Sequence, residues 1–231
     1  PKPETLYDTE LGYKLRRENS SYSVNIYGMV YKDQLVPTGQ LSDVGYSIMT
    51  NVDRSYRLGV ELIAGFRPAE FLNWNLSATF SRNKIPGFVE YYTDYNTTDW
   101  SSEYKSRNLG NVDIAYSPSI ITSSDMTFTP MKRVELHLIS KFVGKQYFDN
   151  TMSSERAIDR YFVNNVRIDF APELKHTERI ELQLLVNNIF NVRYENNAYG
   201  GNWFEDGVEK TWSYYFPQAG TSFMTRLLVR F

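Results

Sequence analysis

In Arg57-Leu58-Gly59-Val60-Glu61-Leu62-Ile63-Ala64-Gly65-Phe66-Arg67, the apolar residues at even positions alternate with a mostly polar or small set at odd positions. Successive side chains of a strand point to opposite sides, so a two-residue period predicts a β-strand with one apolar face. The segment from Asn73 to Ser81 repeats the pattern. These two segments predict neighbouring strands that share an apolar face.

The same alternation recurs along the chain, with almost no stripe of 3.6-residue period, so we expect an all-β protein. It predicts nine strands, and their ends are the least certain part of the prediction. The expected strands cover residues 4–16, 20–34, 54–68, 72–84, 110–129, 133–147, 160–171, 178–194 and 217–231.

The predicted connections alternate strictly between short and long. The long ones cover residues 35–53, 85–109, 148–159 and 195–216. Outer-membrane barrels sort their connections in this way, with short periplasmic turns and long extracellular loops, whereas a soluble sandwich has no reason to do so. A strand of about 10 residues tilted by about 45° also rises roughly 23 Å, which matches the apolar band of such a barrel. The sequence therefore predicts an antiparallel transmembrane β-barrel.

Nine strands do not close a bacterial single-chain barrel, because such barrels have an even number of strands. We therefore expect residues 1–231 to be the C-terminal part of a larger barrel domain, with no plug domain in this chain.

Composition removes several classes of function. The 25 Lys and Arg residues against 27 Asp and Glu leave a net charge of −2, which disfavours nucleic-acid binding. Without cysteine there is no thiolate metal site or cysteine nucleophile. The only histidines, His137 and His176, do not supply a hydrolytic triad or a multi-histidine metal site. We expect no enzyme activity, no cofactor and no bound metal.

Two segments near the C-terminus resemble a known family. Leu185-Val186-Asn187-Asn188-Ile189-Phe190-Asn191-Val192-Arg193-Tyr194 resembles the "NLFN..Y" penultimate strand of TonB-dependent outer-membrane receptors, and residues 215–221 resemble the start of their last strand. Residues 3–13 and 56–61 match earlier strands of the family more weakly. The final strand resembles the terminal signal for barrel assembly, carried by Phe223, Leu227, Val229 and Phe231.

The resemblance implies a plugged barrel of about 22 strands in the outer membrane of a Gram-negative bacterium. It implies active import of an iron–siderophore, haem or cobalamin, with energy delivered by TonB through an N-terminal region absent from this chain. The implied partners are outer-membrane lipid, TonB and the protein's own plug. An alternative is a SusC-like oligosaccharide importer that works with a surface lipoprotein.

Aromatic residues crowd two of the long connections. Flat rings suit the capture of a chelate, a corrinoid or a sugar, and long loops commonly carry binding residues. The alternative is that these loops pack on each other and cap the barrel. The candidate ligand-binding residues are Trp100, Tyr104, Tyr199, Trp203, Trp212, Tyr214 and Tyr215.

Overall fold

The computed structural model describes residues 2–41, 47–173 and 178–230 of the chain. Within these ranges the regular structure is strand, apart from one short 3-10 helix, η1 (Ser154–Arg156). No helix among the described residues is long and apolar enough to cross a membrane. The strands are β1 (Thr5–Arg16), β2 (Ser20–Leu41), β3 (Ser47–Ala69), β4 (Leu72–Tyr95), β5 (Ser102–Asp113), β6 (Ile120–Met131), β7 (Val134–Val143), β8 (Gln146–Tyr147), β9 (Ala157–Ile158), β10 (Tyr161–Phe170), β11 (Arg179–Asn187), β12 (Glu195–Glu205), β13 (Val208–Pro217) and β14 (Ser222–Arg230).

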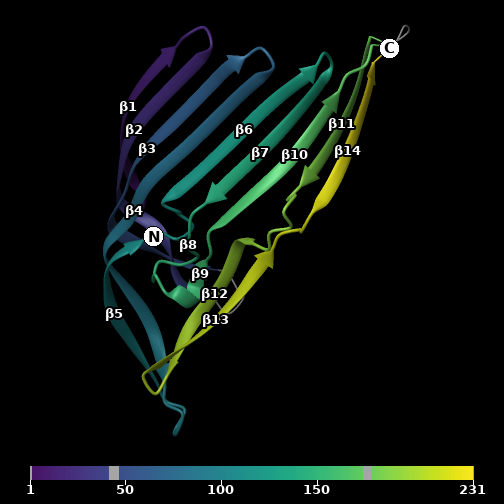
Figure 1. Cartoon of the computed structure of the whole chain (residues 1–231). Helices are drawn as coiled ribbons and strands as arrows, with labels where there is room; N and C mark the ends of the chain where they lie inside the picture. Colours follow the sequence, from purple (N-terminus) through teal and green to yellow (C-terminus); the bar gives the residue numbers. More distant parts are fainter. Residues whose placement is uncertain (1, 42–46, 174–177, 231) are drawn as a thin grey trace.

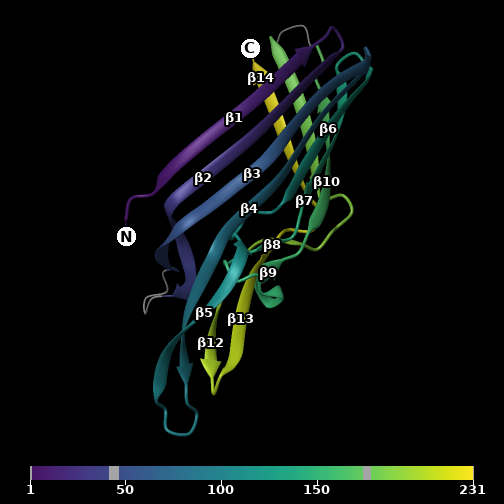
Figure 2. The same cartoon turned by 90° about the vertical axis from the view of Figure 1, so that its left-hand side faces the viewer.

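Twelve of these strands share one sheet, and nine of them follow one another in the antiparallel order β1-β2-β3-β4-β6-β7-β10-β11-β14, the number that the sequence predicts. Figure 1 shows this sheet as a row of tilted strands, and Figure 2 shows that the row curves, with β1 and β14 at its two ends. The short turns gather at one end of the sheet, and β5, β12 and β13 extend beyond the other end. The fold is that of a wall segment of a transmembrane β-barrel.

The strand register builds two different faces. Val24 lies opposite Leu62, and Leu62 lies opposite Ala78, so the apolar rows of neighbouring strands join. The row continues to the last strand, where Leu182 lies opposite Leu227. We call this apolar side the outer face. The opposite, polar side is the lumen face. The predicted assembly residues Phe223, Leu227 and Val229 lie exposed on the outer face, and Phe231 lies outside the described residues.

The prediction of one strand over 110–129 is wrong, because the strand is interrupted between Asp113 and Ile120. Tyr116 takes a positive φ of 53°, and Pro118 cannot donate a ladder hydrogen bond. The two pieces, β5 and β6, pair with different parts of the same edge of β4. Together they take one place in the sheet, which is why the count of nine still holds.

The prediction of long loops over 35–53 and 85–109 is also wrong. They are mostly strand, because β2, β3 and β4 continue well past their predicted ends and β5 pairs with the extended β4. The extensions are stabilised by a small core in which five apolar side chains are buried. These are Val36, Ile85, Phe88, Val112 and Ile114.

Three further strand ends differ from the prediction. The strand expected over 133–147 ends at Val143, the strand expected over 178–194 ends at Asn187, and the last strand starts at Ser222 instead of residue 217. The connection predicted over 195–216 is the hairpin of β12 and β13. In the connection predicted over 148–159, β9 pairs with β8.

Candidate ligand-binding site

The β12–β13 hairpin crosses the lumen side of the sheet. It leaves from β11 and returns to β14, yet its far end pairs with β4, where Phe204 lies beside Asp94 in a parallel bridge. At its tip Asp206 and Gly207 have φ of 50° and 80°, the left-handed pair that a two-residue hairpin requires. The Asp206 amide donates to the Tyr95 carbonyl oxygen, so the tip is fastened to β4. This Asp-Gly turn was a hairpin signal that the sequence interpretation missed.

One face of the hairpin packs toward the wall. Ala198 is buried against Phe148 and Ile158 from the connection between β7 and β10. A Cβ on Gly200 would lie 3.1 Å from the Phe148 ring, so glycine permits this close approach. Tyr215 belongs to the same face, because its hydroxyl donates to the Ala157 carbonyl oxygen at 3.1 Å. The segment between β7 and β10 therefore fills the space between hairpin and wall.

The other face of the hairpin carries an aromatic surface. Tyr199 lies 5.5 Å from Tyr214 and 5.7 Å from both Trp212 and Phe216, measured between ring centroids. Gly201 lies opposite Trp212 in the register, and a Cβ there would come within 3.2 Å of the indole. Because the opposite face packs toward the wall, this surface is turned toward the barrel axis. We call Tyr199, Trp212, Tyr214 and Phe216 the platform.

The structure brings together some of the predicted ligand-binding residues and separates others. Tyr199, Trp212 and Tyr214 are in the platform, and Trp203 is on the same face of β12 with its indole N–H donating to Glu205. Tyr215 lies on the opposite face. Trp100 and Tyr104 belong to the β4–β5 hairpin, where Tyr104 stacks on Tyr91 with centroids 5.9 Å apart.

A partly buried ion-pair network joins the platform's hairpin to β4, β5 and η1. Arg107 of β5 bonds Glu90 of β4 at 2.5 Å and Glu209 of β13 at 2.9 Å. Arg156 of η1 reaches Glu209 at 3.2 Å and Asp149 at 2.8 Å, and it is fully buried. In addition, Asn202 of β12 donates to both Glu90 and Glu209. We call Glu90, Arg107, Asp149, Arg156, Asn202 and Glu209 the clasp.

Two members of the clasp, Arg107 and Glu209, are held in their charged forms. Burial by itself would raise the pKa of Glu209, but hydrogen bonds from Arg107 and Asn202 outweigh it, so the pKa lies below the ordinary 4.5. Burial likewise works against the charged form of Arg107, and its bonds to Glu209 and Glu90 still raise its pKa. Sequence reasoning missed the clasp because its members come from separate segments that share no motif.

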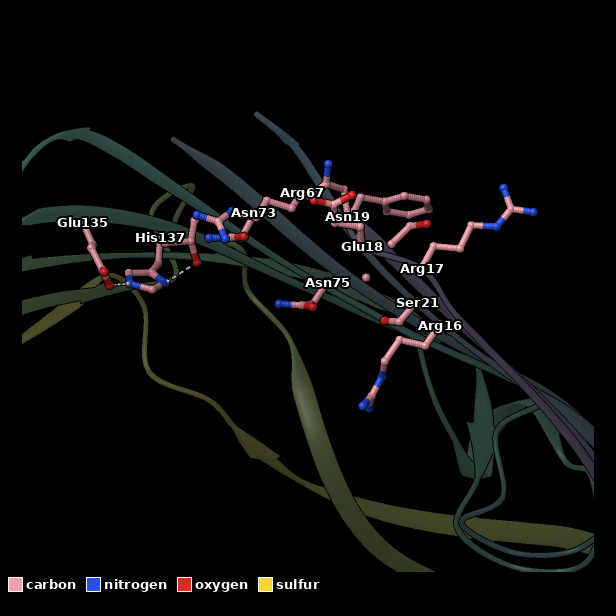
Figure 3. A pocket seen from close by; sticks show the side chains of 14 residues that line it. Arg16, Arg17, Glu18, Asn19, Ser21, Arg67, Asn73, Asn75, Glu135 and His137 are labelled. Atoms are coloured by element: carbon pink, nitrogen blue, oxygen red, sulfur yellow. Dashed lines mark hydrogen bonds and ion pairs between the residues drawn. The ribbon is translucent and has the colours of Figure 1, made fainter. Parts of the chain in front are cut away.

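A hollow of about 500 Å³ lies on the lumen face at the short-turn end. Figure 3 shows Arg16, Arg67 and Glu135 among its labelled residues, with His137 at one side. Charges of both signs line this part of the lumen face, which we call the mixed-charge lumen wall.

His137 is buried in a polar cluster of this wall. Glu135, His137 and Asp169 offer ligand atoms that all lie within 4.8 Å of one another, a grouping that the sequence did not reveal. However, Arg167 already supplies a positive charge there, since its guanidinium bonds Asp169 at 2.9 Å and lies 2.9 Å from His137 Nε2. We assign the cluster a role in holding the wall together. His176 lies outside the described residues.

The wall, its outer face and the crossing hairpin define a piece of a large membrane barrel with elaborated loops. The family described as "TonB dependent receptor-like, beta-barrel" matches residues 2–189. The chain therefore belongs to this family. No protein with a curated description matches it.

Solved structures show the same fold. The ferric yersiniabactin uptake receptor FyuA from Yersinia pestis aligns with 99% of the chain at 17% identity and a TM-score of 0.64. The copper transporter OprC aligns with 98% of it at 16% identity and a TM-score of 0.68. The siderophore receptor PiuA from Acinetobacter baumannii aligns with 99% at 14% identity and a TM-score of 0.67. The chain spans 30%, 31% and 28% of these proteins, respectively.

Proposed function

We propose that residues 1–231 are the C-terminal part of the barrel domain of a TonB-dependent importer in a Gram-negative outer membrane. The observation that carries this proposal is the family match over residues 2–189. The whole-chain alignment with uptake receptors supports it. The plug and the segment that contacts TonB would lie outside this chain, and the mixed-charge lumen wall offers the plug a surface for ion pairs.

The proposed cargo is a scarce metal chelate or corrinoid, with an iron–siderophore first, then haem or cobalamin. The names of the aligned structures favour this class, because they describe siderophore receptors and a copper transporter. They give no support to the alternative, an oligosaccharide importer with a surface lipoprotein. An importer of this kind does no chemistry on its cargo.

The proposed binding surface is the platform. It turns three of the predicted aromatic residues toward the barrel axis, where an arriving ligand would meet them, and the clasp fixes its position. Flat rings at this spacing can stack on a planar chelate or an aromatic ligand group. Trp100 and Tyr104 are a second candidate group, separate from the platform.

The test uses the natural full-length protein in its host. A strain lacking the gene is grown under iron limitation with ferric siderophores, haem or cobalamin, with the gene restored in the presence and absence of TonB. We expect one of these ligands to support growth only when both the gene and TonB are present. Growth on oligosaccharide alone would replace the proposal with its alternative, and uptake without TonB would overturn it.

The platform is tested in the same protein by Tyr199→Ala with Tyr214→Ala. Each ring contributes about 0.5–1.5 kcal/mol beyond its buried area, so we expect affinity for the transported ligand to fall roughly 10- to 100-fold. Tyr7→Ala with Tyr13→Ala is the matched control, because it removes two exposed tyrosines from the outer face of β1. A third variant, Trp100→Ala with Tyr104→Ala, tests the second group. Unchanged affinity in the platform variant would exclude the platform as the binding surface.

A further inference from the structure

The charged residues on the outer face of the sheet are all basic. Along the regularly paired parts of the nine strands, the outward positions are apolar or uncharged except at four places. The composition does not explain this bias, since acidic residues slightly outnumber basic ones in the chain. The four residues are Lys32, Arg54, Arg82 and Lys84.

These four residues form one patch. Lys32 of β2 pairs directly with Arg54 of β3, and Lys84 of β4 pairs with Tyr56, two residues along from Arg54. Arg82 lies on the same face of β4, two residues from Lys84. Direct cross-strand neighbours have Cβ atoms about 5 Å apart and diagonal neighbours about 7–8 Å. Figure 1 shows β2, β3 and β4 side by side, so the patch is continuous across three strands.

Three of the four positive charges have no carboxylate partner in the described part of the chain. Lys84 is paired with Asp113 at 2.7 Å, and Asp33 next to Lys32 is paired with Lys2 at 3.7 Å. Asp53 precedes Arg54 but makes no ion pair with it in the described structure. Lys32, Arg54 and Arg82 are exposed on the outer face with their charges uncompensated.

The patch lies where the apolar band ends. Lys32 follows the outward Val30, and Arg82 follows the outward Phe80, both on the side of the long connections. In a barrel of this kind that side is extracellular. A lipid-facing cation is costly at the bilayer centre and nearly free at the interface, so these residues belong at the level of the lipid headgroups. Their long stems can lie along the apolar wall while the charged ends reach outward.

We propose that Lys32, Arg54 and Arg82 bind the phosphate groups of a lipid in the outer leaflet. Guanidinium groups match phosphate oxygens in geometry and charge, and a lysine adds a third positive charge. The adjoining apolar rows would contact the acyl chains of the same lipid. The proposal rests on the membrane-spanning fold and does not depend on which ligand the barrel imports.

The test uses the full-length protein in detergent, titrated with the phosphorylated glycolipid extracted from the host outer membrane and read by native mass spectrometry. Each basic residue near an anionic lipid surface contributes about fivefold in affinity, so Lys32→Gln with Arg54→Gln and Arg82→Gln should weaken binding about a hundredfold. The matched control is Lys14→Gln with Arg16→Gln and Arg226→Gln, which neutralises one exposed lysine and two exposed arginines on the lumen face and should leave binding unchanged.

A second arm repeats the titration with the same glycolipid after phosphatase has removed its phosphates. We expect the wild-type protein to bind this form as weakly as the patch variant binds the intact lipid. Equal binding of both lipid forms, or equal loss in the patch and control variants, would overturn the proposal. Variants that keep the heat-modifiable gel mobility of the unmodified protein are folded. A loss of binding in them is therefore assigned to the patch.

Discussion

Asn188 shows how one residue ends a strand and fixes the next. Its φ of 50° turns the chain after β11, a conformation that asparagine tolerates better than most residues. Its side-chain oxygen accepts the Val192 amide, and its NH₂ group donates to the carbonyl oxygens of Val192 and Ala219. Asn191 continues the pattern, because its side chain accepts the Thr221 amide just before β14. The segment that carries the "NNIFN..Y" resemblance therefore connects the last two strands of the sheet through hydrogen bonds, and we call these contacts the latch.

Replacing Asn188 should destabilise the barrel. Asn188→Ala leaves three backbone groups without their partners, which costs about 2–4 kcal/mol in the free energy of unfolding. Urea unfolding of the natural protein in lipid vesicles measures the change. Asn187→Ala is the neighbouring control, because no side-chain hydrogen bond of Asn187 is lost. Equal effects of the two substitutions would show that the latch contributes nothing to stability.

At the scale of elements, the clasp explains why a long connection has one defined position. The β12–β13 hairpin buries only one face and pairs with β4 over two residues, so its position depends on polar contacts. Glu209 receives bonds from Arg107, Arg156 and Asn202, which come from three different segments. Such a charged network is strong when every member is paired and costly when one is lost.

The clasp predicts a pH dependence with a definite sign. The folded state lowers the pKa of Glu209 below 4.5, so its stabilising contribution is complete above that pH and is lost as the pH falls through the lowered value. Spin labels at Ser102→Cys and Val208→Cys would report the distance between β5 and the hairpin. We expect one narrow distance distribution from pH 8 to 5 and a broad one at pH values below the lowered pKa of Glu209.

Glu209→Gln is the control for this measurement. Without the carboxylate, the distance distribution should be broad at every pH and show no transition at low pH. A narrow distribution in Glu209→Gln at neutral pH would show that the clasp does not hold the hairpin.

At the scale of the whole molecule, the two faces of the sheet predict opposite responses to charge. Leu62 and Ile63 are adjacent exposed residues of β3, but Leu62 is in the outer face and Ile63 in the lumen face. Leu62→Arg places a charge in the lipid, which costs about 2–4 kcal/mol near the midplane. Ile63→Arg meets a polar wall and should cost much less. Folding stability in vesicles compares them, and similar losses would contradict the assignment of the faces.

The sequence by itself determined the nine-strand wall, its two faces and the family resemblance. The alternation can be recognised within each strand separately, because each strand has its own apolar row. When the strands pair, these rows lie on the same face of the sheet. Gly59 is a small example, since a Cβ there would come within 2.5 Å of the Tyr27 ring on the lumen face. This contact joins two neighbouring strands. The alternation over Arg57–Arg67 is enough to predict that Gly59 lies on the polar face.

Only the tertiary structure decided what the long connections do. Asn202 and Glu90 meet across 112 positions of sequence, and Asp206 and Thr97 across 109, so no local pattern could announce these contacts. The arrangement of β5 and β6 was also decided by the tertiary structure. Both strands pair with β4, which is longer than predicted, so together they take one place in the sheet. Periodicity specifies which side of a strand is apolar, whereas the path of a hairpin across the lumen depends on partners that folding brings together.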